Sequence, residues 1–282
     1  MSPSPIEIGA PLAVVLVALA LLGAGVVGWA RLGAPGTVLT AAGRATVQLG
    51  VVAMVIVLVL RSWWSAGVFI LLMYVVAAGT SARRITGVPV GRILGAPVRR
   101  ILGTSRVLGR PRTDATPADR ISAGGWTTLL PIGLGVAPAL VLLVGTGAVP
   151  ATPLAVLPTA GILVGGAMTA TSLAGRRALD ELRTRRGEYE AGLALGLTDR
   201  EAALEVCRTT AGQALVPALD QTRTVGLVTL PGAFVGVLLG GAGPVQAGAT
   251  QLLILVALLA VEAVAIAATV ELVAGQRLTR PD

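Results

Sequence analysis

The sequence predicts an all-α membrane protein with about seven transmembrane helices. Apolar residues make up 54% of the chain and charged residues 13%, and the mean hydropathy of +0.84 lies far above that of soluble domains. Several apolar stretches reach the roughly 20 residues that a helix needs to cross a bilayer core. Their continuous Leu, Val and Ala runs lack the alternation of lipid-facing strands, which favours helices over a barrel.

The expected spans follow one another along the chain with two longer polar interruptions. We place the spans at residues 10–30, 42–60, 65–82, 125–148, 154–174, 225–242 and 248–273. An Arg-rich loop at 83–124 and a second polar segment at 175–223 separate them into groups. The first span is too long, and too acidic at Glu7, for a secretory signal peptide. We therefore expect residues 1–282 to form a single transmembrane domain.

The arginines predict the orientation, because basic residues in short loops stay on the cytoplasmic side. All 22 basic residues are arginines. With the N-terminus outside and the C-terminus inside, every arginine except Arg61 falls in an inside segment. Topology and anionic lipid headgroups of the inner leaflet then account for the net charge of +8, and no nucleic-acid partner is expected.

The Arg-rich loop at 83–124 contains a weak repeat of an arginine, two apolar residues and a glycine. The repeat stands at 92–95, 100–103 and 106–109. We interpret the loop as a basic linker held against the inner leaflet by its arginines and short apolar insertions. A dedicated partner site is the alternative.

The second polar segment, 175–223, predicts two helices joined by a tight turn. Gly196 can end the first helix in a left-handed conformation that costs glycine nothing. Thr198 and Glu201 have the S/T-x-x-E spacing of a capping box, which starts a second helix expected to run to Pro217. The result would be a short, sharply turned element that projects into the cytoplasm.

The same segment carries a resemblance to a known family. Glu190-Ala191-Gly192-x-x-x-Gly196, followed by a capped helix and a proline, resembles the EAA loop of ABC-transporter permeases. Three further stretches are similar to the FetB-type (UPF0014) permease family, which includes bacterial iron-export permeases and plant aluminium-tolerance proteins. These are G-R-A-x-x-Q-L at 43–49, L-P-x-A-G-I-x-x-G-x-A-M at 157–168, and P-A-L-D-Q-T-R-T-V-G-L-V-x-L-P-G at 217–232 with Gly236, Gly240, Pro244 and Gln251.

The resemblance implies a permease that dimerises in the cell membrane, exports iron or another metal ion, and works with a separate ABC ATP-binding subunit. It assigns coupling to that subunit to Glu190, Ala191, Gly192, Gly196, Thr198 and Glu201. A chain without lysine cannot contain the phosphate-binding pattern G-x-x-x-x-G-K-[ST], so ATP hydrolysis is expected in the partner and this chain is not expected to be an enzyme. No cofactor is expected. An amphipathic loop helix without a partner is the alternative.

The chain departs from the family pattern at three places. Gly166 stands where members commonly have Asn, and Ala233-Phe234 stands where bacterial members commonly have Met-Met. The loop at 83–120 is also longer. The first two changes remove polar or soft donors from the implied pathway, which weakens the expectation of a metal substrate.

The predicted translocation pathway follows two prolines inside expected spans. Such breaks free backbone carbonyls that protein or a water-lined cavity must satisfy, which favours residues 157–168 and 225–240. The candidate pathway residues are Gln48, Pro158, Gly161, Met168, Pro231, Gly232 and Glu262. Close packing through glycines, and interhelix hydrogen bonds from the glutamines, are the alternative interpretation.

Glu262 is the intramembrane candidate for chemistry. An acidic group near the middle of a span costs roughly 2.5 to 3.5 kcal/mol on insertion scales, so it is a functional-site hypothesis and should face the bundle interior. A structural, protonated carboxyl that hydrogen-bonds a neighbouring helix is the alternative. The chain has no histidine and one cysteine, Cys207 in an inside segment, so a His/Cys metal site is excluded and any metal ligands remain unknown.

We therefore rank three classes of function by how well they explain the sequence. An ABC permease comes first, because it alone explains a rigid turned loop with the EAA-like spacing. A proton-coupled secondary transporter that uses Glu262 comes second and would need no ATPase. A membrane enzyme comes third, because the chain lacks His and Lys and has no clustered acids on a helix face.

Overall fold

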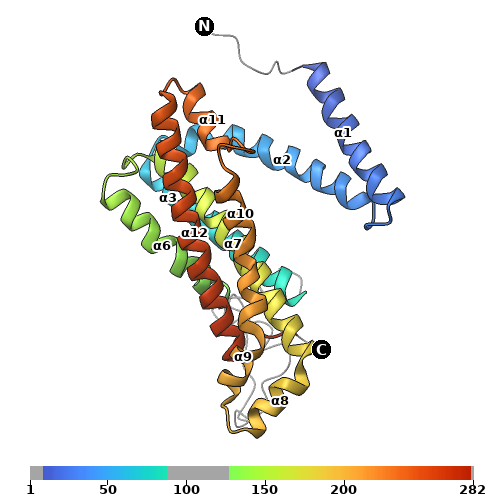
Figure 1. Ribbon diagram of the computed structural model, residues 1–282. Coiled ribbons are helices and arrows are strands. Elements are labelled where there is room, and N and C mark those ends of the chain that lie inside the picture. Colours follow the sequence, from blue (N-terminus) through green and yellow to red (C-terminus); the bar gives the residue numbers. More distant parts are fainter. Residues whose placement is uncertain (1–8, 88–126, 281–282) are drawn as a thin grey trace, which may run out of the picture. The chain divides into compact units, whose positions relative to one another are not determined.

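A computed structural model describes residues 9–87 and 127–280, and most of these residues are helical (Figure 1). Five helices in the described ranges are long and apolar enough to cross a membrane: α1 (Ala10–Trp29), α2 (Gly36–Val59), α3 (Trp63–Thr86), α7 (Pro153–Thr184) and α12 (Pro244–Ala274). A shorter apolar helix of 17 residues, α6 (Leu129–Gly145), precedes α7. The predicted all-α membrane fold is confirmed. The Arg-rich loop lies outside the described residues from 88 onward.

The span expected at 225–242 is not one continuous helix. α10 (Val216–Thr224) ends in a tight loop, in which the N–H groups of Leu227 and Val228 both donate to the Thr224 carbonyl. α11 (Gly232–Leu239) then has only 8 residues. Two local preferences explain the break. Gly226 adopts a φ of +81°, and Pro231 disfavours the helical conformation in the residue before it.

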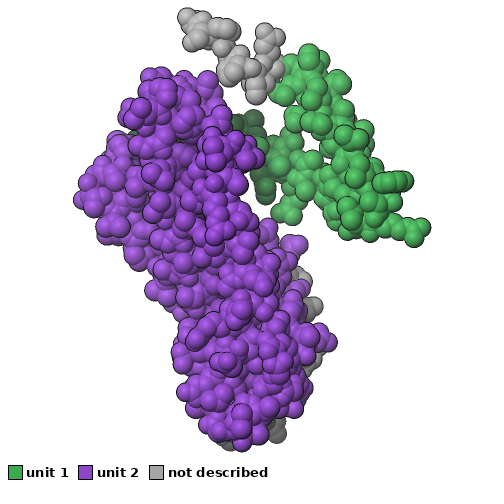
Figure 2. All heavy atoms as spheres, viewed as in Figure 1, with its two compact units in different colours: residues 1–65 green, residues 66–282 purple. Residues whose placement is uncertain are grey.

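Contacts within the chain divide it into two compact units, residues 1–65 and 66–282 (Figure 2). In the first unit α1 packs against α2. In the second unit α12 is the central helix, and it packs against α7, α6 and α9. The helices of the second unit form two buried apolar clusters, one toward α9 and the other around α6.

Glycines let helices of the second unit approach closely. A Cβ atom added at Gly135 of α6 would lie 2.6 Å from the backbone oxygen of Val261 in α12. A Cβ added at Gly175 of α7 would lie 2.6 Å from Cδ1 of Ile85 in α3. Interhelix hydrogen bonds add to this packing, since the Ser81 hydroxyl donates to the Met168 carbonyl at 3.0 Å.

The Gly135 contact gives a stability prediction. Gly135→Ala should destabilise the fold by about 1 to 3 kcal/mol and lower the unfolding temperature, because a backbone oxygen cannot turn away from the new methyl group. Gly145→Ala in the same helix is the control, because nothing lies within 4 Å of a Cβ there. Thermal unfolding in detergent checks both variants. Equal unfolding temperatures would contradict the packing of α6 on α12.

The predicted polar segment at 175–223 is helical almost throughout. α7 continues to Thr184, and α8 (Arg186–Ala194) follows after a break at Arg185. The second helix, α9 (Asp199–Gly212), ends before Pro217, so the prediction that it runs to that proline is wrong. A 3₁₀ turn, η1 (Gln213–Leu215), joins it to α10. Pro217 instead lies in the first turn of α10, where a missing N–H breaks no helical hydrogen bond.

Candidate functional site

The turn between α8 and α9 is the first candidate site, and it lies at the end of the second unit opposite α11 (Figure 1). Gly196 has a φ of +92°, as the sequence predicts. The Leu197 N–H donates to the Gly192 carbonyl at 3.1 Å, and the Gly196 N–H donates to the Leu193 carbonyl at 3.0 Å. This pair of bonds is a Schellman motif, which closes the C-terminus of α8.

The start of α9 is held by the predicted capping box. The Glu201 N–H donates to the Thr198 hydroxyl at 3.3 Å, and the Thr198 N–H donates to the Glu201 carboxylate at 2.9 Å. The Thr198 hydroxyl also donates to the Glu201 carboxylate, at 2.8 Å. The two bonds that the carboxylate accepts from the Thr198 backbone and hydroxyl lower the pKa of the Glu201 carboxyl below its usual range. The C-terminus of α8 and the N-terminus of α9 are therefore both held by specific hydrogen bonds, and the turn between them is a rigid element.

Gly192 allows α8 and α9 to meet closely behind this turn. A Cβ at Gly192 would lie 3.2 Å from the Ala202 Cβ and 3.4 Å from Leu197 Cδ1. Glu190 and Ala191 are exposed on α8, and the Glu190 carboxylate pairs with Arg186 at 2.8 Å. The coupling residues expected from the sequence thus gather in one hairpin, some as its scaffold and some on its surface.

Leu195 is a surface residue of this turn that the sequence analysis missed. Its exposed fraction is 85%, and Leu197, on the other side of Gly196, is exposed as well. Its place in the sequence indicated this position, because Leu195 comes directly before the glycine that ends α8 and so lies at the turn. The tip therefore offers a small apolar contact, and the exposed Asp199 and Arg200 follow it along the chain.

Strong contacts attach the hairpin to the rest of the second unit. Cys207 is fully buried between α9 and its neighbours, and burial raises the pKa of its thiol. The Arg200 guanidinium pairs with Glu271 of α12 at 2.7 Å. Arg185, between α7 and α8, pairs with Glu181 at 3.3 Å and also donates to the Val206 carbonyl of α9. These contacts join the hairpin to α7 and α12.

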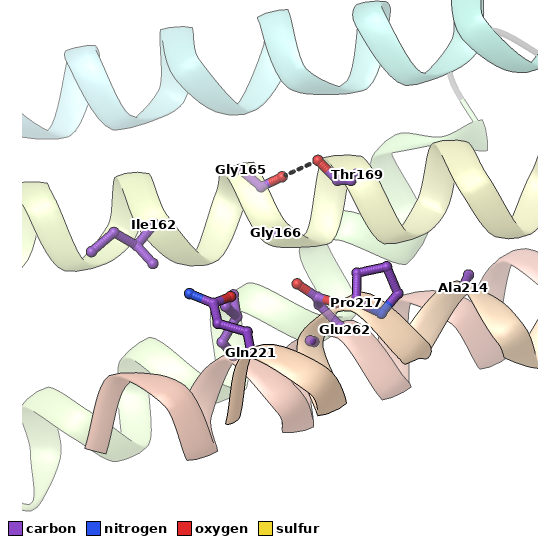
Figure 3. Close-up of a pocket in the computed structure, with 10 residues that line it drawn as sticks. Ile162, Gly165, Gly166, Thr169, Ala214, Pro217, Gln221 and Glu262 are labelled. Atoms are coloured by element: carbon purple, nitrogen blue, oxygen red, sulfur yellow. Dashed lines mark hydrogen bonds between the residues drawn. The ribbon is translucent and has the colours of Figure 1, made fainter. Parts of the chain in front are cut away.

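The second candidate site is a cavity of about 270 Å³ between α7, α10 and α12 (Figure 3). Its walls are formed by Ile162, Gly165, Gly166, Thr169, Ala214, Pro217, Ala218, Gln221, Leu258 and Glu262. Glu262 is 8% exposed, and its carboxylate points from α12 toward α7. Within the described part of the chain, no hydrogen bond or ion pair reaches that carboxylate.

Gly166 leaves the space that the Glu262 carboxylate occupies. A Cβ at Gly166 would lie 2.8 Å from Oε1 of Glu262 and 2.3 Å from Cδ1 of Leu258. One turn away, the Thr169 hydroxyl donates to the Gly165 carbonyl at 3.0 Å (Figure 3). The hydroxyl proton is therefore used in a hydrogen bond within α7, and the lone pairs of the Thr169 oxygen remain available to accept hydrogen bonds.

A family model described as "Uncharacterised protein family (UPF0014)" matches residues 11–277. The chain belongs to this family. The UPF0014 membrane protein STAR2 of rice is 32% identical over 227 residues, which is 80% of this chain and 68% of the relative. No solved structure matches.

Two further relatives of this UPF0014 protein align over about half of each chain. The protein ALUMINUM SENSITIVE 3 of Arabidopsis thaliana is 36% identical over 138 residues, 49% of this chain and 50% of the relative. The probable iron export permease protein FetB of Escherichia coli is 32% identical over 132 residues, 45% of this chain and 49% of the relative.

The pathway residues expected from the sequence lie on several helices of this UPF0014 protein. Among them, Glu262 lines the cavity. Gly161 lies beside Cε of Met73 in α3, and the Met168 carbonyl accepts from Ser81, so both belong to helix packing. Gln48 lies in α2 of the first unit, Pro158 lies inside α7, and Pro231 and Gly232 begin α11.

Gln221 of α10 is a polar cavity residue that was not among the pathway residues expected from the sequence. It stands four residues after Pro217, and side chains at this spacing share one face of a helix. Gln251, which was interpreted as an interhelix hydrogen bonder, accepts from the Phe234 N–H at 3.2 Å and so anchors α11 to α12. The glutamine of α10 faces the cavity, whereas that of α12 serves packing.

Proposed function

We propose that this chain is the membrane-spanning permease subunit of an ABC transporter in the cell membrane, and that a separate ATP-binding subunit drives it. One observation carries the proposal. The rigid hairpin of α8 and α9 continues through η1 into α10, which forms a wall of the Glu262 cavity. One run of helix therefore connects a polar tip suited to docking with a buried carboxylate.

The hairpin tip has the properties of a docking element. Leu195 supplies an exposed apolar contact, and the Arg186–Glu190 pair further along α8 can exchange its ion pair for charges on a partner. The Schellman motif and the capping box hold the backbone in one conformation before binding. Little conformational entropy is then lost on docking.

The transmission path runs from α9 through the 3₁₀ turn to α10. Short 3₁₀ segments between α-helices often mark hinges. Here η1 separates α9, which the buried Cys207 anchors, from α10, which bears Gln221. Rotation at η1 would move Pro217 and Gln221 relative to Glu262. We propose that closure of the ATP-binding subunits changes the cavity in this way, with two copies of the permease working together.

A metal ion is the first substrate candidate, because the Escherichia coli relative is named a probable iron export permease. Carboxylate and amide oxygens of Glu262 and Gln221 are ligands for hard cations. No group of three or more His, Cys, Asp or Glu side chains gathers in the described residues. The two side chains in the cavity would therefore form at most part of a metal coordination shell.

A proton-driven secondary transporter is the second candidate function, and the buried carboxylate of Glu262 favours it. Transport into proteoliposomes that contain the permease and its candidate ATPase separates the two. Under the ABC proposal, transport requires hydrolysable ATP and persists when an ionophore collapses the proton gradient. Transport that needs no ATP and stops with the ionophore would overturn the proposal.

A further inference from the structure

The cavity beside Glu262 combines one carboxylate with walls that carry no basic side chain. We propose that it binds a small organic amine in its ammonium form, with the N–H groups directed to Glu262 and Gln221. The binding proposal stands without an ATPase. That the amine is the transported substrate rests on the ABC permease function proposed above, and the amine would then replace the metal ion as its substrate.

The charge of the site comes from Glu262 alone. The residue is 8% exposed and its carboxylate lines the cavity, and no described residue donates a hydrogen bond to it or forms an ion pair with it. A buried ionised carboxylate without a partner is strongly unfavourable, so a positively charged ligand that enters the cavity gains the missing interaction. One carboxylate balances one positive charge, which favours a singly charged ligand over a di- or trivalent ion.

The polar groups fit an ammonium better than a bare metal ion. Glu262, Gln221 and Thr169 are the side chains of the cavity wall that carry oxygen. A hard divalent ion such as Ca²⁺ takes about six to eight oxygen ligands, which is more than these side chains supply. A primary ammonium has only three N–H donors, and three acceptors of this kind satisfy it.

The remaining walls favour a ligand with a hydrocarbon part. Ile162, Leu258, Ala214, Ala218 and Pro217 present apolar surface around the polar groups, as in other small-molecule pockets. A volume of about 270 Å³ suits a molecule smaller than a drug. The wall has no aromatic side chain, and quaternary ammonium groups are usually held by aromatic cages. The amine should therefore be primary or secondary.

The test uses the full chain in lipid nanodiscs and four probes at matched ionic strength. These are butylammonium chloride, butyltrimethylammonium chloride, 1-butanol and MnCl₂, with binding followed by calorimetry and by the unfolding temperature. Butylammonium should bind saturably and raise the unfolding temperature. Glu262→Gln should weaken its binding by about tenfold or more, because a charge-assisted hydrogen bond is lost.

Two further variants keep the test decisive if Glu262→Gln fails to fold. Gln221 is exposed toward the cavity, so Gln221→Leu should retain the fold and weaken butylammonium binding about threefold. Glu205→Gln removes an exposed carboxylate of α9 away from the cavity and should leave binding unchanged.

Three results would overturn the proposal. Equal binding of butylammonium to wild type and to both cavity variants would mean that it does not occupy this site. Tighter Glu262-dependent binding of Mn²⁺ would mean a metal site, and binding of no probe would leave the carboxyl structural. ATPase association does not enter the readout, so this test can fail while the proposed function stands.

Discussion

Glu262→Gln is expected to lower ATP-driven transport by about tenfold or more, because it removes the charge that the cavity offers to a cationic substrate. The amide nearly preserves the shape of the carboxyl, so it should still fit the space beside Gly166. ATP hydrolysis and association with the ATP-binding subunit should also survive, because the hairpin is unchanged.

The measurement is substrate flux into proteoliposomes together with phosphate release by the same sample. Glu205→Gln is the matched control, because it makes the same chemical change on the exposed face of α9. A variant with normal flux would show that Glu262 is a structural carboxyl, which is the alternative that the sequence left open. Loss of both flux and folding would be recognised from the unfolding temperature.

Gly196→Leu is expected to uncouple ATP hydrolysis from the permease. Gly196 has a φ of +92°, and a left-handed conformation costs roughly 1 to 2 kcal/mol for a residue with a side chain. The new residue should leave that conformation, and the two Schellman hydrogen bonds would be lost with it. The tip would then no longer present Leu195 in one fixed direction.

Gly187→Leu is the control for this variant. Gly187 lies in α8, and nothing is found within 4 Å of a Cβ at that position. Permease-stimulated ATP hydrolysis should fall severalfold in Gly196→Leu and remain near wild type in Gly187→Leu. Equal stimulation in both variants would show that the geometry of the turn does not matter for coupling.

The sequence predicted the hairpin well because its rules are local. A helix-ending glycine and a capping box each depend on a few consecutive residues, and both were found at Gly196 and at Thr198 with Glu201. The buried position of Glu262 was also predictable, since the cost of an acidic group in lipid directs it inward.

The broken sixth span was not predicted, because hydropathy averages over a window. Residues 225–242 carry no charged side chain, and the averaged hydropathy does not register the left-handed Gly226 or the effect of Pro231 on the residue before it. The end of α9 was misplaced for a related reason. Pro217 is tolerated in the first turn of a helix as well as after its end, so it did not mark a boundary.

The composition of the cavity could not be read from the sequence. Its walls come from α7, α10 and α12, and their proximity depends on tertiary packing through small residues. Gln221 looks like one polar residue among several in a polar segment until α10 is placed against α12. Of the pathway residues predicted from prolines and glycines, Gly161 packs against Met73 of α3. Glu262, which was predicted from its charge, lines the cavity.

The central claim is that the α8–α9 tip docks an ATP-binding subunit. Co-purification of the tagged chain with its candidate ATPase in lipid tests it directly, with Leu195→Asp as the main variant and Glu190→Arg beside it. Leu195 is 85% exposed, so the substitution should not disturb folding. Leu32→Asp is the control, because Leu32 is also exposed, at 74%, in the turn between α1 and α2. Our account predicts that wild type and Leu32→Asp retain the ATPase, while Leu195→Asp loses it. Retention of the ATPase by Leu195→Asp and Glu190→Arg, with normal hydrolysis, would contradict the account.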